Sequence, residues 1–145
     1  MQSTRYFTAA FFILVILSGC SFFNNRFEQI TGRFNVGYTN RKAFNVICEN
    51  YTSEDDIGGI IIVPAYVFAV GHNSEFIIAK QHPIPGDDHE GEPDVTITNY
   101  YVVDINRKFS KDLVAGPLNA AQFDSIRAAY DISSIQFDKQ FPDKP

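Results

Sequence analysis

The densest group of potential metal ligands in the sequence is the acidic run from Asp87 to Asp94. Six of its eight residues carry a carboxylate or an imidazole. Oxygen donors beside a glycine suit Ca²⁺ better than Zn²⁺, but the run lacks the alternating donor spacing of a calcium loop. Clustered carboxylates in a connection rich in proline and glycine usually form a solvated loop. A solvated loop is therefore the favoured interpretation, and no cofactor is predicted. If the run does bind a metal, the candidate ligands are Asp87, Asp88, His89 and Glu90.

Histidines offer a second possible metal site. His72 and His82 flank the expected strand Phe76–Gln81, so strand pairing can bring them near each other or near His89. A three-histidine zinc site needs all three rings to converge, and nothing in their spacing requires this. Surface histidines are the simpler interpretation.

The sequence contains no recognisable catalytic constellation. No serine lies in a Gly-x-Ser-x-Gly turn, and Gly58-Gly59 lacks the lysine and the following helix of a phosphate-binding loop. Cys48 alternates with Phe44 and Val46 on an expected strand, which favours a buried structural thiol. A nucleophilic cysteine would need a basic partner. We therefore predict that the protein is not an enzyme.

Other charged residues fit structural roles. Asp55 and Asp56 could act with further carboxylates in hydrolysis. Such catalysis requires a particular distance between the carboxyl groups, which a sequence does not reveal. Lys80 and Arg127 are expected to face the sheet and to form a structural ion pair with Asp104.

Composition excludes some partners and indicates a β-rich core. The chain has 12 basic and 17 acidic residues, a formal net charge of −5, and no basic run. Such a chain is a poor candidate for nucleic acid or an anionic surface. Fourteen phenylalanines and seven tyrosines, with no tryptophan, are typical of packed strands.

The N-terminus has the three parts of an export signal. Arg5 supplies a positive charge, Phe7–Leu17 is apolar except for Thr8, and two small residues follow. The stretch Phe7–Gly19 spans only about 20 Å as a helix, too short to cross a bilayer. A short buried helix, or an ordinary signal cleaved elsewhere, remains an alternative.

The end of this signal resembles the lipobox of bacterial lipoproteins, matched by Leu17, Ser18, Gly19 and Cys20. The resemblance implies cleavage between Gly19 and Cys20, a diacylglyceryl thioether on Cys20, and acylation of its new amino group, for example with palmitate. Two or more acyl chains anchor a protein stably. Ser21 favours the outer membrane if the cell is Gram-negative. We therefore expect a protein held by lipid in the cell envelope, outside the cytoplasm.

These features predict three segments: a signal peptide over 1–19, a lipidated N-terminus and tether over 20–28, and a single globular domain over 29–145. The mature chain has 126 residues and a net charge of −6, enough chain to bury a core. Cys48 is then the only free cysteine, so no intramolecular disulfide forms.

Alternating hydrophobicity predicts most of the mature domain as strands. Pro64 indicates an edge strand. Thr52–Gly59 and residues 82–94 are expected loops. Asn99 is the one polar exception on the apolar face of the last expected strand. The expected extended segments are 30–38, 44–49, 60–63, 66–71, 76–81 and 95–105.

One helix is expected near the C-terminus. Asn119 is a plausible N-cap, and Gln122 stands where a capping box needs it. Phe123, Ile126 and Tyr130 form one apolar stripe that should lie on the sheet. We therefore predict an α+β fold, a mostly antiparallel meander of five or six strands with one C-terminal helix packed on it.

Four short segments stand out between residues 29 and about 132: Ile30–Phe34, Glu75–Lys80, Tyr100–Asp104 and Gly116–Leu118, with Phe123 and Arg127. With these segments, the stretch resembles a family of uncharacterised bacterial lipoproteins defined by domain of unknown function 3997. The family resemblance brings no known activity, cofactor or catalytic residue.

The expected function is that of a lipid-anchored envelope protein that binds an envelope protein partner without catalysis. Two alternatives stay open. An acidic anchored domain could inhibit a cationic envelope enzyme such as a lysozyme, because opposite charge speeds encounter. The 87–94 loop could instead bind a metal.

Overall fold

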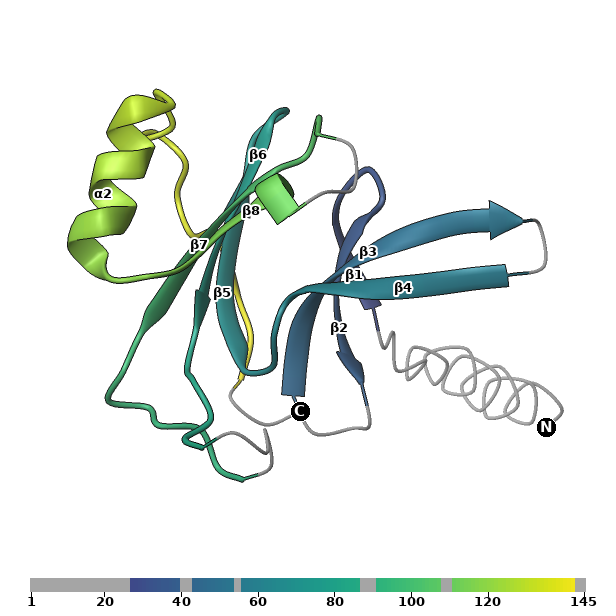
Figure 1. The fold of residues 1–145 in the computed structure, drawn as a ribbon, viewed down its shortest axis with the longest axis horizontal. Coiled ribbons are helices and arrows are strands. Elements are labelled where there is room, and N and C mark those ends of the chain that lie inside the picture. The colour runs from purple at the N-terminus through teal and green to yellow at the C-terminus, as the bar shows by residue number, and fades with distance from the viewer. Residues whose placement is uncertain (1–26, 40–42, 54–55, 87–90, 108–110, 143–145) are drawn as a thin grey trace, which may run out of the picture.

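The computed structural model describes residues 27–39, 43–53, 56–86, 91–107 and 111–142. Within these residues the chain forms two antiparallel sheets and one α-helix (Figure 1). The predicted α+β class is confirmed. The expected signal peptide, lipobox and most of the tether lie outside the described residues.

The first sheet is built from the N-terminal half of the domain. Its order is β1-β2-β3-β4. Gly32 begins the β1–β2 turn with a φ of 53°, and the next residue has a negative φ, which is the pattern of a type II′ hairpin. The strands are β1 (Phe27–Thr31), β2 (Phe34–Thr39), β3 (Ala43–Ser53) and β4 (Asp56–Val63).

The second sheet has the order β8-β7-β6-β5-β9. A short 3₁₀ helix, η1 (Lys111–Leu113), precedes β8, and α2 (Ala120–Ala129) follows it. The strands are β5 (Val67–His72), β6 (Phe76–Gln81), β7 (Asn99–Asp104), β8 (Val114–Leu118) and β9 (Lys139–Gln140).

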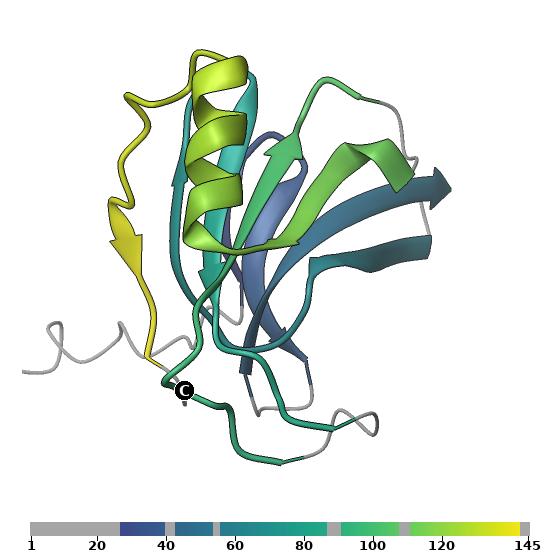
Figure 2. The ribbon, with the colours of Figure 1, turned by 60° about the vertical axis from the view of Figure 1, so that its left-hand side comes forward.

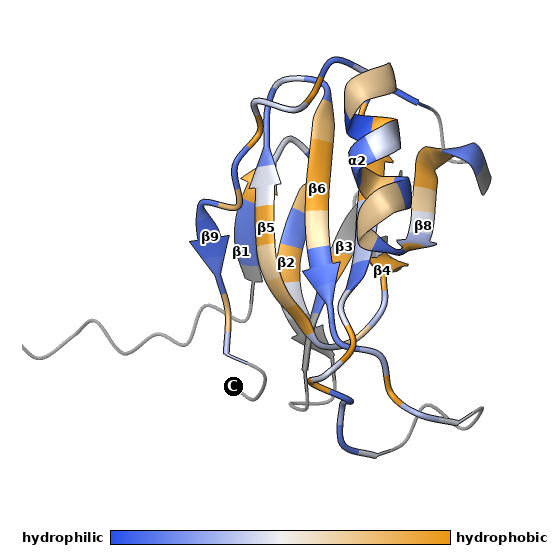
Figure 3. Ribbon diagram, turned by 90° about the vertical axis from the view of Figure 1, so that its left-hand side faces the viewer, coloured by the Kyte–Doolittle hydropathy of each residue, from blue (hydrophilic) through white to orange (hydrophobic). Residues whose placement is uncertain are grey.

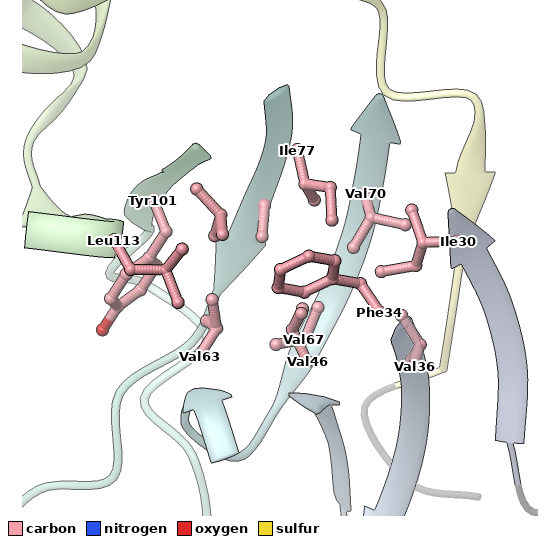
Figure 4. Packing of buried hydrophobic residues seen from close by; sticks show 12 residues of the cluster. Ile30, Phe34, Val36, Val46, Val63, Val67, Val70, Ile77, Tyr101 and Leu113 are labelled. Carbon is pink, nitrogen blue, oxygen red and sulfur yellow. The ribbon is translucent and has the colours of Figure 1, made fainter. Parts of the chain in front are cut away.

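The main hydrophobic core lies between the two sheets. Figure 4 shows the ring of Phe34 between side chains of the second sheet, with Ile77 and Val67 near it. Leu113 of η1 closes one side of this core. The sandwich therefore depends on apolar residues from both halves of the domain.

A second core lies between α2 and the outer face of the second sheet (Figures 2 and 3). Phe123 stacks on Tyr100 with ring centroids 4.7 Å apart, and Tyr130 stacks on Phe76 at 5.3 Å. The predicted capping box of Asn119 is present. The predicted helix and its apolar stripe are confirmed.

The strands outnumber the prediction and are divided differently. Nine strands in two sheets lie within the described residues, rather than five or six in one meander. The expected loop Thr52–Gly59 is largely strand, because β3 and β4 pair as a long hairpin. The last long strand begins at Asn99 rather than Val95, and β8 and β9 have no counterpart among the expected segments.

The two long sides of the sandwich differ. On one side, Lys139 of β9 forms a 2.6 Å ion pair with Glu28 of β1 and so links the two sheets. On the other side, β4 is the edge of the first sheet, and it ends at Val63, directly before Pro64, as predicted. Its exposed Ile60 and Ile61 leave this side more open.

Candidate functional site: a pocket between the sheets

A cavity of about 400 Å³ lies between the sheets, where the chain crosses from β4 to β5. Its volume falls within the range of small-molecule sites, about 300 to 1,000 Å³. The wall is mainly apolar with a few amide groups. Residues from both sheets contribute to it, among them Asn45, Ile61, Pro64, Gln81, Asn99 and Tyr101.

Two of these amides are held in fixed orientations. Gln81 is buried and donates from Nε2 to the carbonyl oxygen of Ala65 at 2.9 Å. Asn99 donates from Nδ2 to Oε1 of Gln81 at 3.0 Å. Antiparallel pairing of β6 with β7 places these two residues opposite each other. The pocket therefore presents preoriented hydrogen-bonding groups in an apolar surround.

Tyr101 supplies a phenol to the same wall. Burial raises the pKa of its hydroxyl above the ordinary value of 10.0, so the group stays neutral over the physiological range. Its ring packs against Gly116, where a Cβ would lie 2.3 Å from Cδ1 of Tyr101. The absence of a side chain at Gly116 thus leaves room for the ring beside the cavity.

Backbone contacts tie the connections around the pocket together. The amide of His82 donates to the carbonyl of Tyr66 at 3.1 Å, and the Tyr66 hydroxyl donates to the carbonyl of Gly91 at 3.1 Å. The ring of His82 stacks on Phe68 at 4.1 Å. These contacts therefore join the β4–β5 crossing and the long β6–β7 connection into one rim around the pocket.

Comparison with known proteins identifies the family. The family described as "Protein of unknown function (DUF3997)" matches residues 31–141, which is most of the chain and nearly all of the described fold. The chain belongs to the DUF3997 family. The search of curated proteins and the search of solved structures each found no match.

The structure does not place the predicted metal ligands of this DUF3997 protein, and it describes only the end of the acidic run. Asp87, Asp88, His89 and Glu90 lie outside the described residues. Asp94, at the end of the same run, accepts hydrogen bonds from the hydroxyl and the amide of Thr96 at 2.6 and 2.9 Å. These bonds lower the pKa of Asp94. Among the described residues, no group of three potential ligands converges.

The suggestion that His72 and His82 could approach each other is wrong. His72 lies at the turn end of the β5–β6 hairpin, opposite Ile77, whereas His82 follows Gln81 at the open end. Several residue pairs of the ladder separate them. His82 instead contacts the carbonyl oxygen of Ile97 through Nδ1 at 2.8 Å, and His89 lies outside the described residues.

The predicted ion pair is also wrong. Asp104 pairs with Arg107 at 2.9 Å. Arg127 donates to the carbonyl oxygen of Ile135 at 2.9 Å, and Lys80 lies 4.4 Å from the ring centroid of Phe137. Both cations hold the segment after α2 against the sheet.

Several other predicted residues cannot be placed in the site. Asp55, Gly19 and the lipidation residue Cys20 lie outside the described residues, and the side chains of Cys48 and Asp56 are also not described. No helix among the described residues has the length and hydropathy to cross a bilayer.

No pattern in the sequence indicated the pocket as a whole. Its strongest local signal was Asn99, a polar residue on an otherwise apolar strand face. The partners of Asn99 across the cavity, such as Asn45 and Ile61, come from the other sheet. Only knowledge of which distant strands pack together could have identified these residues as neighbours of Asn99.

Replacement of Tyr101 by phenylalanine should change the alkaline stability of the protein. The pKa of Tyr101 is higher in the folded state than in the unfolded chain. The stability from its burial is therefore complete below about pH 10 and is lost as pH rises through the folded-state value. Urea unfolding from pH 7 to 11 should show a smaller alkaline loss in Tyr101→Phe. Parallel pH curves for variant and parent would contradict this.

Proposed function

We propose that this DUF3997 protein is a non-catalytic binding module, held in the cell envelope by lipid at Cys20, whose ligand enters the pocket between the sheets. The observation that carries the proposal is the cavity of about 400 Å³, with an apolar wall and oriented amides. Such concave, mainly apolar sites with few convergent polar groups are the usual form of ligand sites.

The polar groups of the pocket suit recognition. Gln81 and Asn99 each offer an amide that donates and accepts hydrogen bonds, and Tyr101 adds a neutral phenol. The amides do not titrate, and the pKa of the phenol is raised further from neutrality. The matching ligand is uncharged and mostly apolar, with one or two hydrogen-bonding groups. A small molecule or a side chain of an envelope protein partner has this chemistry.

The anchor rests on the match of Leu17–Cys20 to a lipobox. A lipid anchor confines the pocket near the membrane and raises its effective concentration for other membrane-bound proteins. If the cell is Gram-negative, Ser21 favours the outer membrane.

Replacing Cys20 with serine tests the anchor. We expect the parent protein to fractionate with membranes and to carry the mass of a diacylglyceryl group and an acyl chain on Cys20. The Cys20→Ser variant should lose the lipid and the membrane association. Cys48→Ser is the matched control and should fractionate like the parent. Recovery of parent protein with an unmodified Cys20 would reject the anchor.

Filling the pocket tests the binding site. Ala65 lines the cavity, and only its backbone oxygen bonds Gln81, so Ala65→Leu occupies space while keeping that bond. We expect the uncharged fluorophore prodan to bind the parent saturably and to bind Ala65→Leu at least about tenfold more weakly, a loss of about 1.4 kcal/mol.

Ala121→Leu is the matched control, because Ala121 is exposed on α2 and is not among the pocket residues. It adds the same volume to the protein and should leave prodan affinity unchanged. Equal affinities for parent and Ala65→Leu, or absence of saturable binding, would contradict the assignment of the pocket.

A further inference from the structure

One end of the sandwich gathers the β4–β5 crossing and the β6–β7 connection. We call this end the loop pole and define it by Pro64–Tyr66 and the described residues of 82–98. The side chain of Gln81 and the amide of His82 bond to the crossing at 2.9 and 3.1 Å. In Figure 1 the β6–β7 connection reaches the bottom of the view, away from the end where α2 finishes.

By strand register, the chain enters the first sheet in the same row as the end of β4. Phe27, the first residue of β1, pairs with Gly37, and Gly37 pairs with Asn45. Asn45 in turn lines the pocket together with Pro64. Because Val46 pairs with Val63, the start of β1 is level with Pro64, at the β4–β5 crossing, across the first sheet.

The length of chain before β1 limits how far this pole can stand from the anchor. Only six residues separate Cys20 from Phe27. Seven peptide steps span at most about 25 Å when fully extended. A lipid on Cys20 therefore keeps Phe27, the first residue of β1, within that distance of the anchor.

Two large apolar side chains are exposed at this pole. Val95 is 57% exposed and Ile97 is 48% exposed. Their turn is held by Asp94, whose amide donates to the carbonyl of Pro83 at 2.8 Å and whose carbonyl accepts from the amide of Ile97 at 3.1 Å. Thr96 adds the two bonds to the Asp94 carboxylate. The turn therefore presents both side chains on a supported backbone.

We propose that the loop pole lies on the lipid bilayer, with Val95 and Ile97 inserted between the headgroups. The proposal rests on the lipid anchor of the proposed function. The occupant of the apolar surface is lipid because the short chain from Cys20 ends level with Pro64 of this pole, so the anchor lets this end of the sandwich reach the bilayer. Burial of apolar side chains at the headgroup boundary adds to the binding that an acyl anchor provides.

The charges of the same loop limit the contact. The run from Asp87 to Asp94 carries five carboxylates, which an anionic bilayer repels. We therefore expect closer contact with phosphatidylcholine vesicles than with vesicles containing phosphatidylglycerol, and added salt should reduce the difference.

The sequence has no tryptophan, so one introduced indole reports on one position. We compare Ile97→Trp with Tyr130→Trp in the lipidated mature protein on phosphatidylcholine vesicles. Tyr130 is 49% exposed and stacks on Phe76, at the opposite end of β6 from Gln81. With brominated phosphatidylcholine, quenching of the Ile97→Trp indole should be at least about twofold greater, with emission shifted to the blue.

The outcomes separate the orientation from the anchor. Mass spectrometry of the same preparation reports the lipid on Cys20. If Cys20 is unmodified, a maleimide lipid coupled to it in a Cys48→Ser background restores the anchor for the quenching experiment. Equal quenching of the two indoles in anchored protein overturns the proposal. Shielding of the Ile97→Trp indole only by added envelope proteins also overturns it, in favour of a protein partner.

Discussion

Truncation of Phe34 to alanine is expected to lower the free energy of unfolding by about 4 kcal/mol. Phe34 is 2% exposed, and its ring lies in the core between the sheets (Figure 4). Removal of the ring leaves a cavity walled by both sheets, for example by Val46 of β3 and Ile77 of β6. Neither sheet can close this cavity without moving as a whole. Because a domain of this size is stable by about 5 to 15 kcal/mol, the variant should be close to unfolding.

Urea denaturation followed by circular dichroism measures this loss. Phe34→Leu is the graded control, because it keeps most of the apolar volume and should cost about 1.5 kcal/mol or less. A midpoint for Phe34→Ala within the error of the parent would show that the sheets do not pack on this ring.

Replacement of Gly71 by alanine is expected to cost about 3 kcal/mol. A Cβ at Gly71 would lie 1.8 Å from the carbonyl oxygen of Gln136 and 2.8 Å from its carbonyl carbon. These are backbone atoms of the segment between α2 and β9, so no side-chain rotation relieves the overlap. Either β5 or this segment must move, and Phe137 and the β5–β9 pairing move with it.

Gly32→Ala is the matched control for Gly71→Ala. Gly32 has a φ of 53°, and a Cβ added there would meet no atom within 4 Å, so alanine at this position introduces backbone strain without overlap. Its expected cost is about 1 to 2 kcal/mol. Chemical denaturation should rank Gly71→Ala as the less stable variant. The reverse order would contradict the close approach of residues 136 and 137 to β5.

The pocket and the exposed turn belong to the same end of the molecule. Pro64 and Gln81 link the cavity to the crossing and to the β6–β7 connection, and that connection carries Val95 and Ile97. If the loop pole lies on the bilayer, a ligand reaches the pocket at the membrane surface. Such a location favours an apolar ligand, and the mainly apolar wall of the cavity suits a ligand of that kind.

Local sequence determined several elements of the fold. The capping box of Asn119 and Gln122 and the stripe of Phe123 and Ile126 specify α2, because caps and helical periodicity act within a few residues. Alternation likewise located parts of most strands, and Pro64 marked an edge. The family could also be recognised from short segments of the chain.

The division into two sheets was decided by tertiary structure. Residues 77–79 and 101–103 are buried runs without alternation, because β6 and β7 face the first sheet on one side and α2 on the other. A meander covered by one helix was the simplest arrangement of such strands. Short strands such as β9 exist only through their partner, since two residues carry no pattern of their own.

The candidate site shows the same limit. The types of Gln81, Asn99 and Tyr101 were visible, but the pocket needs Asn45 and Ile61 from the other sheet. A sequence pattern specifies which face of a strand is buried, whereas contacts between sheets depend on which distant segments pair and in which register. For that reason the sequence alone determined the helix and parts of most strands and predicted the anchor, and only the tertiary structure decided how the sheets meet around the pocket.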